Sequence, residues 1–196
     1  MSSLLNTIAG QLDEQTVHQI SSQLGADDTT TQQAISAALP MLVGALGRNA
    51  ATSDGAQALD NALARDHDGS ILNDLPAMVA SNATMQDGEA ILGHVLGNRR
   101  NNVENGISQV TGLDQGSTGQ LLTMLAPIVL GALGQQKQQQ GLDVQALAGL
   151  LTQERQASES SLGGFAQLLD LDGDGEISDE IIGIGSSLLN NLFSGR

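Results

Sequence analysis

The feature that most constrains the fold of this chain is an internal repeat. Residues 40–47 read PMLVGALG, and residues 127–134, 87 positions later, read PIVLGALG. Further matched residues keep the same shift without a gap, which chance does not produce. We therefore predict a tandem duplication of a multi-helix unit, in which residues 4–63 and 91–150 fold alike. The further matched pairs are Leu5 and Leu92, Gly10 and Gly97, Ile20 and Ile107, Ser21 and Ser108, Gly25 and Gly112, Asp27 and Asp114, and Thr31 and Thr118.

Composition predicts that the repeated unit is helical. The 196 residues include two Phe and no Trp or Tyr, so Leu, Ile, Val, Ala and Met must form the core. Such a core favours closely packed helices over a sandwich or barrel, which normally uses aromatic and β-branched residues. We predict an all-α fold with two units, residues 1–80 and 81–196, which can also form one compact domain.

Apolar residues at helical spacing mark three helices in the first unit. The first spans residues 4–12, and the second lies between an N-cap at Asp13 and a stop at Gly25. Pro40 falls inside the third helix, and Pro127 holds the matching position in the second unit. Because proline removes a backbone hydrogen bond and clashes with the preceding turn, we predict a kink or a break at both.

The third helix, which we expect to begin after a cap at Asp28 or Thr29, is rich in small residues. Gly44 and Gly47 have no side chain, and several neighbours are alanines. Another backbone can therefore approach closely, and we interpret this stretch as tight helix packing rather than a ligand site.

An acidic run near the C-terminus has the pattern of a calcium-binding loop. Asp170, Asp172 and Asp174 occupy alternate positions, and Gly175 follows at once, as in the first half of an EF-hand loop. Apolar residues at helical spacing lie on both sides, which predicts a C-terminal EF-hand-like helix–loop–helix. The bidentate glutamate of such a loop would stand at position 181, where the chain has Ile181.

Calcium is the cofactor that this pattern predicts. We expect carboxylate ligands from Asp170, Asp172 and Asp174, and the backbone carbonyl of Glu176. Asp179 or Glu180 would then replace the missing glutamate. The alternative interpretation is an acidic, solvated turn.

A weaker copy of the acidic pattern closes the first unit. Residues 66–71 read DHDGSI, but Ala64 stands where the first carboxylate would be, so only Asp66, Asp68 and Asp74 could bind a metal. We interpret this segment as a capped turn, with a metal site as the weaker alternative. Its residues precede the matching residues of the C-terminal loop by 106 positions, which is 19 more than the 87 positions of the repeat. The 19 additional residues predict an extra helix within residues 143–161.

Charge and hydropathy limit the partners. A net charge of −15, with seven cationic residues against 22 carboxylates, cannot supply the phosphate contacts of nucleic-acid binding, and it disfavours anionic membranes. The longest apolar stretches, residues 34–47 and 121–134, are too short to span a bilayer. The first residues do not resemble a signal peptide. We expect a cytoplasmic location by default, with non-classical export to the cell surface as the alternative.

No catalytic motif stands out in the sequence. His18, His67 and His94 are far apart, and we expect His94 at the edge of the core. We find neither a nucleophile elbow nor a phosphate-binding loop. The sequence favours a non-enzymatic structural or self-assembly module that binds itself or another protein. The alternatives are a calcium-responsive protein-binding module and an enzyme with an unrecognised site. A small molecule bound in a pocket lined by His67 or His94 would favour the enzyme.

Several segments resemble a known bacterial family. Residues 66–71, 91–97 (ILGHVLG), 112–114 (GLD) and 121–134 (LLTMLAPIVLGALG) are similar to domain-of-unknown-function family 937, which is related to the YidB-like proteins. The resemblance covers most of the chain, including a closing acidic loop. It implies an all-helical fold and a bacterial origin, and it implies no activity.

Overall fold

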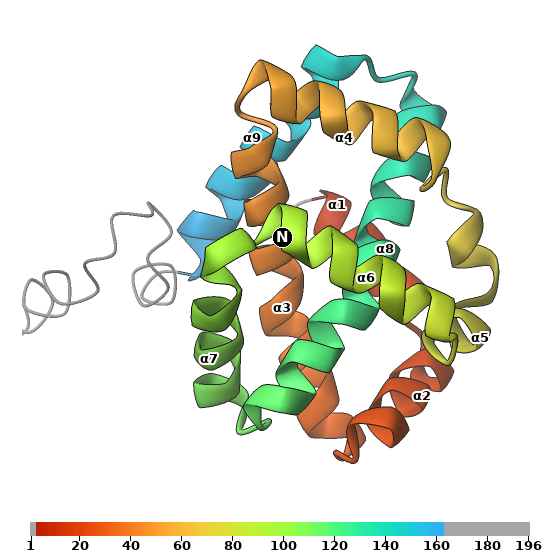
Figure 1. The fold of residues 1–196 in the computed structure, drawn as a ribbon, viewed down its shortest axis with the longest axis vertical. Helices are drawn as coiled ribbons and strands as arrows, with labels where there is room; N and C mark the ends of the chain where they lie inside the picture. The colour runs from red at the N-terminus through yellow and green to blue at the C-terminus, as the bar shows by residue number, and fades with distance from the viewer. Residues whose placement is uncertain (1–2, 163–196) are drawn as a thin grey trace, which may run out of the picture. The chain divides into compact units, whose positions relative to one another are not determined.

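The computed structural model describes residues 3–162, with the side chains of residues 4–157. Within this span every regular element is a helix, which confirms the predicted all-α class. The elements are α1 (Ser3–Gln11), α2 (Glu14–Leu24), α3 (Asp28–Asn49), α4 (Ser53–Arg65), η1 (Ser70–Asp74), α5 (Leu75–Val79), α6 (Asn82–Val95), η2 (Gly97–Arg99), α7 (Arg100–Thr111), α8 (Gln115–Gln140) and α9 (Val144–Leu162) (Figure 1).

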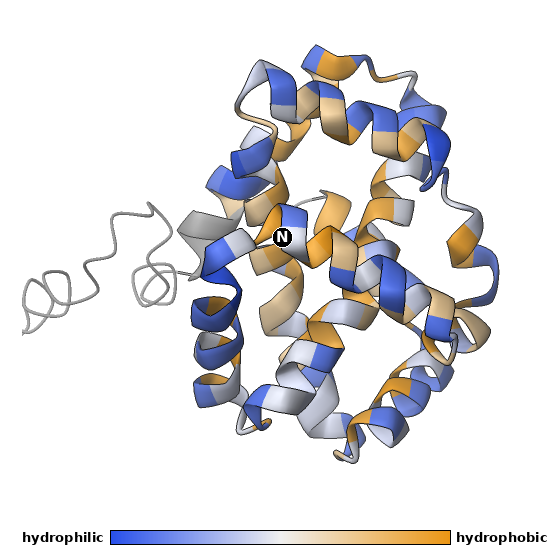
Figure 2. Cartoon of the chain, in the orientation of Figure 1, coloured by the Kyte–Doolittle hydropathy of each residue, from blue (hydrophilic) through white to orange (hydrophobic). Residues whose placement is uncertain are grey.

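Helix α8 is the core of the described part. Every residue from 121 to 134 is buried, and the helix contacts α1, α2, α3, α4, α6, α7 and η1. A helix that is apolar all round must be covered on every side. Figure 2 shows the contrast with α7, whose ribbon is largely hydrophilic. These seven elements therefore pack around α8.

Corresponding positions of the repeat carry the same helix caps. Gly25 ends α2 and Gly112 ends α7, both in the left-handed conformation, with φ of 66° and 75°. Asp27 caps α3 and Asp114 caps α8. Each aspartate accepts a hydrogen bond from the backbone N–H three residues later, at 2.9 and 3.0 Å. Within each pair of caps the two residues are 87 positions apart, as the repeat requires. The duplication of the whole unit stays a prediction.

The predicted boundaries in the first unit are close to the observed ones. Asp13 caps α2 as predicted, by accepting a hydrogen bond from the N–H of Thr16 at 2.8 Å. The cap of α3 is Asp27, one residue before the predicted alternatives Asp28 and Thr29. The error is small because all three residues have a side-chain oxygen that can cap a helix.

Neither proline breaks its helix. Of the two predicted outcomes, a kink or a break, the break is therefore wrong. Helix α3 continues through Pro40, and α8 continues through Pro127. The seven residues that follow each proline, 41–47 and 128–134, are all buried. The stabilisation from burying these residues therefore outweighs the loss of one backbone hydrogen bond at each proline.

The carbonyl that Pro127 leaves without its intrahelical donor belongs to Thr123, and it is buried. Gly88 of α6 lies directly against this oxygen, and a Cβ at residue 88 would overlap it. The corresponding carbonyl in α3 belongs to Ser36, which is exposed and accessible to water. Helix α6 thus covers an uncompensated carbonyl of α8, and only glycine permits that approach.

Tight packing at small residues is confirmed at one of the two predicted glycines of α3. A Cβ at Gly47 would lie 2.9 Å from the carbonyl oxygen of Leu151 in α9, whereas a Cβ at Gly44 would meet nothing within 4 Å. The matching residue of Gly47 in the second unit, Gly134, lies against the carbonyl of His67. In both copies of the motif, the backbone of another segment therefore approaches the last glycine closely.

The segment predicted to hold an extra helix is helical. It forms α9, Val144–Leu162, after α8 ends at Gly141 with φ of 62°. Residues 1–158 make one compact unit, in which α8 contacts α1, α2 and α3 of the first half. The division of the chain at residue 80, and the origin of α9 as an insertion, stay predictions.

The contact at Gly88 gives a stability prediction with a matched control. Gly88→Ala should lower the free energy of unfolding by about 1–3 kcal/mol, because the new methyl must displace the Thr123 carbonyl. Gly93→Ala on the same helix should raise it by about 0.5–1 kcal/mol, because a Cβ there meets nothing within 4 Å. Urea denaturation measures both, and equal effects of the two substitutions would contradict the close contact.

Candidate functional site

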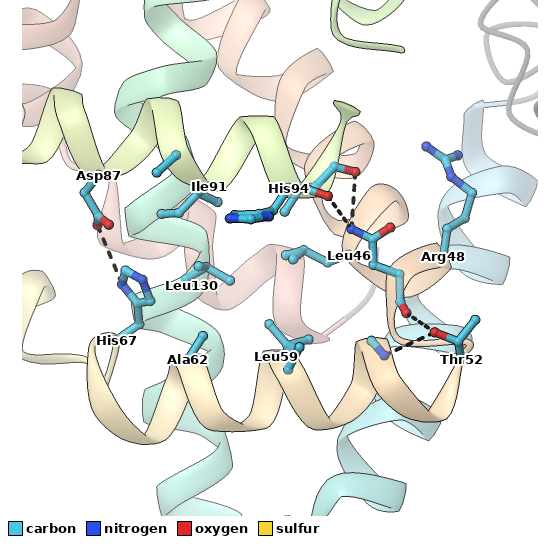
Figure 3. Close-up of a pocket in the computed structure, with 15 residues that line it drawn as sticks. Leu46, Arg48, Thr52, Leu59, Ala62, His67, Asp87, Ile91, His94 and Leu130 are labelled. Carbon is cyan, nitrogen blue, oxygen red and sulfur yellow. Dashed lines mark hydrogen bonds and ion pairs between the residues drawn. The ribbon is translucent and has the colours of Figure 1, made fainter. Parts of the chain in front are cut away.

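A groove of about 630 Å³ lies among α3, α4, α6 and α8 (Figure 3). Its size falls in the range of ligand pockets, which is roughly 300–1,000 Å³. Apolar side chains from all four helices form most of its wall. They include Leu46 of α3, Leu59 and Ala62 of α4, Ile91 and Val95 of α6, and Leu130 of α8.

The turn between α3 and α4 closes one end of the groove. Thr52 caps α4 by accepting a hydrogen bond from the N–H of Gly55 at 3.1 Å, and its hydroxyl donates to the carbonyl of Asn49 at 3.3 Å. The Asn49 amide donates in turn to the carbonyls of His94 and Val95, at 3.1 and 3.3 Å. The uncharged polar groups at this end are therefore engaged in joining the α3–α4 turn to the end of α6.

His67 and Asp87 form the opposite end. His67 follows α4, and its side chain is 8% exposed. Its Nδ1 lies 3.8 Å from Oδ2 of Asp87 in α6, which is farther than a hydrogen bond, and the Asp87 side chain is 45% exposed. Among the described side chains, none hydrogen-bonds the imidazole. A buried ring and a half-exposed carboxylate thus face each other across this end of the groove.

The structure brings together two histidines that the sequence keeps apart. His94 is exposed and lines the groove between its two ends, so its expected place at the edge of the core is correct (Figure 3). His67 lines the same groove from α4's side. His18 lies elsewhere, with Nδ1 3.2 Å from Oδ2 of Asp28 on the exposed surface. Sequence reasoning missed Asp87, for which no motif gives a signal.

The acidic turn at residues 66–74 uses its carboxylates locally. Asp68 accepts a hydrogen bond from the N–H of Ser70 at 2.9 Å, which lowers the pKa of its carboxyl group. Asp74 caps α5, and Asp66 is the C-cap residue of α4 with its carboxylate 3.9 Å from Arg65 Nη2. These are the contacts of a capped turn, while metal binding by the three aspartates stays an untested prediction.

The predicted calcium ligands Asp170, Asp172, Asp174, Glu176, Asp179 and Glu180 lie outside the described residues. Within residues 4–157, no three His, Asp or Glu side chains are close enough to hold a metal ion together. The calcium site therefore stays a prediction from the sequence.

A second polar cluster, formed by Glu89, Arg100 and Glu104, joins α6 to α7. The Arg100 guanidinium donates to both oxygens of Glu89, at 2.5 and 2.9 Å, and to Glu104 at 2.7 Å. Thr123 of α8 also donates to Glu89, at 2.9 Å. The hydrogen bonds from Arg100 are the main reason that the pKa of Glu89 is lowered. These hydrogen bonds join α6, α7 and α8, so the role of the cluster is to hold helices together.

Comparison with known proteins places the chain in a family. The family model described as a bacterial protein of unknown function (DUF937) matches residues 6–136, which is more than half of the chain. The chain belongs to this family. No curated protein and no solved structure matches it.

The DUF937 match contains the whole groove and leaves out the acidic C-terminal loop. The groove residues run from Leu46 to Leu130, inside the matched span. The predicted calcium loop begins at Asp170, well beyond residue 136. The groove is thus formed by the part of the chain that defines it as a DUF937 protein.

One helix in the described part is long and apolar enough to cross a membrane. It is α8, and 83% of its most apolar stretch is buried among the other helices. Burial within the fold accounts for its apolar character, since a core helix needs the same composition.

The Glu89 cluster predicts a pH dependence of stability. Because the folded-state pKa of Glu89 is lowered, its ion pair stabilises the protein above the unfolded-state pKa of about 4.3 and loses this effect as pH falls through the folded value. Glu89→Gln should therefore destabilise the protein at neutral pH and much less near pH 3. Urea denaturation across this range measures the difference, and a constant difference would contradict the ion-pair account.

Proposed function

We propose that this DUF937 protein is a non-enzymatic helical module that binds itself or another protein and carries a calcium-binding C-terminal loop. The observation that supports it most is the use of its carboxylates. Asp13, Asp27 and Asp114 cap helices, while Glu89 and Asp60 form ion pairs with Arg100 and Lys137.

The direction of the pKa shifts supports a structural role for these groups. Wherever a carboxyl pKa departs clearly from its ordinary value in the described part, it is lowered, through hydrogen bonds that favour the charged form. A catalytic acid requires the opposite shift, which apolar burial produces. The carboxylates with a lowered pKa thus act as hydrogen-bond acceptors within or between helices and turns.

The duplicated pattern supports self-assembly as the form of binding. The paired caps at Gly25 and Gly112, and at Asp27 and Asp114, indicate two units with related surfaces. Related surfaces that pair within one chain can also pair between chains, which gives closed dimers or larger assemblies. We therefore propose that the two units arose by tandem duplication and that this chain forms contacts with its own copies.

The proposed calcium loop rests on the chemistry of its residues. Asp170, Asp172 and Asp174 crowd three negative charges into five positions, and a bound divalent cation turns their repulsion into coordination. Asp179 or Glu180 must close the shell, because Ile181 replaces the usual bidentate ligand. A displaced ligand weakens the site, and we expect a Kd of roughly 10⁻⁵–10⁻³ M. Calcium binding would hold the C-terminal segment in one conformation, to which a partner could bind.

The groove supports a second candidate function, an enzyme whose site it contains. His67 and His94 both line it, and the imidazole of His67 lies 3.8 Å from the carboxylate of Asp87. A histidine oriented by a carboxylate can act as a general base. Chemical change of a compound bound in the groove, lost in His67→Gln while binding persists, would identify this function.

Calcium binding is tested on the full chain by titration calorimetry and thermal melts. Calcium at roughly ten times the Kd should stabilise the protein by about 1.4 kcal/mol, which raises the melting temperature by about 3–6 °C. Asp172→Ala should abolish both the heat of binding and the thermal shift. Asp54→Ala, which removes an exposed aspartate from α4, is the matched control and should respond like the native chain. A native chain that gives no heat with millimolar calcium would overturn the calcium site.

Self-assembly is tested by light scattering over a range of protein concentrations, with calcium and with a chelator. We expect the mean mass to rise with concentration above that of the 20.1 kDa chain. A constant monomer mass under both conditions would remove the proposed self-association and leave binding to another protein.

A further inference from the structure

We propose that the groove among α3, α4, α6 and α8 binds a small amphiphilic ammonium compound. Its apolar body would lie between α4 and α6, and its charged group would lie beside Asp87 and His67. The residues of this site, 46–130, are other residues than those of the predicted calcium loop.

The wall of the groove selects an apolar body. Leu59 and Ala62 of α4 face Ile91 of α6 across the groove, and Leu46 and Leu130 lie between them (Figure 3). These side chains offer no hydrogen bonds, so a polar ligand would lose its hydration without compensation. A hydrocarbon chain or ring loses nothing there and gains contact with the wall.

The two ends of the groove differ in the hydrogen bonds that their side chains already make. At the other end, Asn49 and Thr52 already bond to backbone groups of the α3–α4 turn and of α6. His67 is more than nine-tenths buried and lines the groove, and none of the described side chains hydrogen-bonds its ring. A ligand in the groove can therefore hydrogen-bond the ring where it lines the groove.

Charge decides the sign of that ligand's polar group. The carboxylate of Asp87 stands beside His67 and is 45% exposed, so it can accept hydrogen bonds from a ligand. Arg48 lies at the opposite end, near the α3–α4 turn (Figure 3). A cationic group is therefore directed toward Asp87. The net charge of −15 further raises the local concentration of cations and lowers that of anions.

The experiment compares three probes of one length: hexylamine, 1-hexanol and hexanoate. Each is titrated into the full chain at neutral pH, and binding is followed by amide chemical shifts in NMR spectra. We expect hexylamine to bind most tightly, hexanol several-fold more weakly and hexanoate not at all. The largest shifts should fall on residues of the groove, such as Ala62, Ile91 and Val95.

Two pairs of variants test the two halves of the proposed site. Asp87→Asn should weaken hexylamine binding at least about tenfold and leave hexanol unchanged, because it removes the charge that accepts a hydrogen bond from the ammonium group. Asp54→Asn removes the same charge from a neighbouring helix outside the groove and should have little effect. Ala62→Leu should block all probes by filling the groove, whereas Ala64→Leu, on the exposed face of α4, should not.

Several outcomes would overturn the proposal. Equal weakening by Asp87→Asn and Asp54→Asn would show that ammonium groups bind the acidic surface in general. Hexanoate binding as tight as that of hexylamine would reverse the charge assignment. Shifts that avoid the groove, or a complete lack of binding by all three probes, would show that the groove is not this site. Thermal melts of all four variants establish that each remains folded.

Discussion

The rest of the structure depends on the close contact between the backbones of α6 and α8 at Gly88. Residues 3–162 contain no Phe, Tyr or Trp, so the core described here cannot fill wide gaps and its helices must approach closely. At Gly88 the approach also covers the Thr123 carbonyl, which Pro127 leaves without a donor. The residues on either side of Gly88 are Asp87, which faces the groove, and Glu89, which joins Arg100 and Thr123. One contact thus positions both polar features of α6.

The distribution of polar groups separates the parts that hold the fold from the part that can bind a ligand. The capping aspartates and the Glu89 cluster are satisfied within the protein, and their lowered pKa values follow from those bonds. The end of the groove at His67 is different, because its imidazole and carboxylate lie 3.8 Å apart. In the described part of this DUF937 protein, the groove therefore has side chains that can still bind a ligand. This holds whatever the role of the C-terminal acidic loop.

Local chemistry made much of the fold predictable from the sequence. The two ends of α2 follow from Asp13 and Gly25, because each residue caps the helical turn beside it. The groove was not predictable in the same way, since His67 and Asp87 meet only after α4 and α6 have packed on α8. The helix break expected at Pro127 is wrong for a related reason, because burial of residues 128–134 outweighs a local defect. Sequence spacing reports contacts along one helix, and it does not report which helices lie side by side.

Native-state hydrogen exchange tests the central claim, that α6 and α8 form one tightly packed unit, most directly. Amides of α8 within residues 121–134 and amides of α6 near Gly88 should exchange slowest, with the same free energy as global unfolding. Amides of α4, which packs on α8 through a narrower apolar face, should exchange through smaller openings. If α6 exchanges at a lower free energy than α8, independently of global unfolding, then the contact at Gly88 does not hold the structure together.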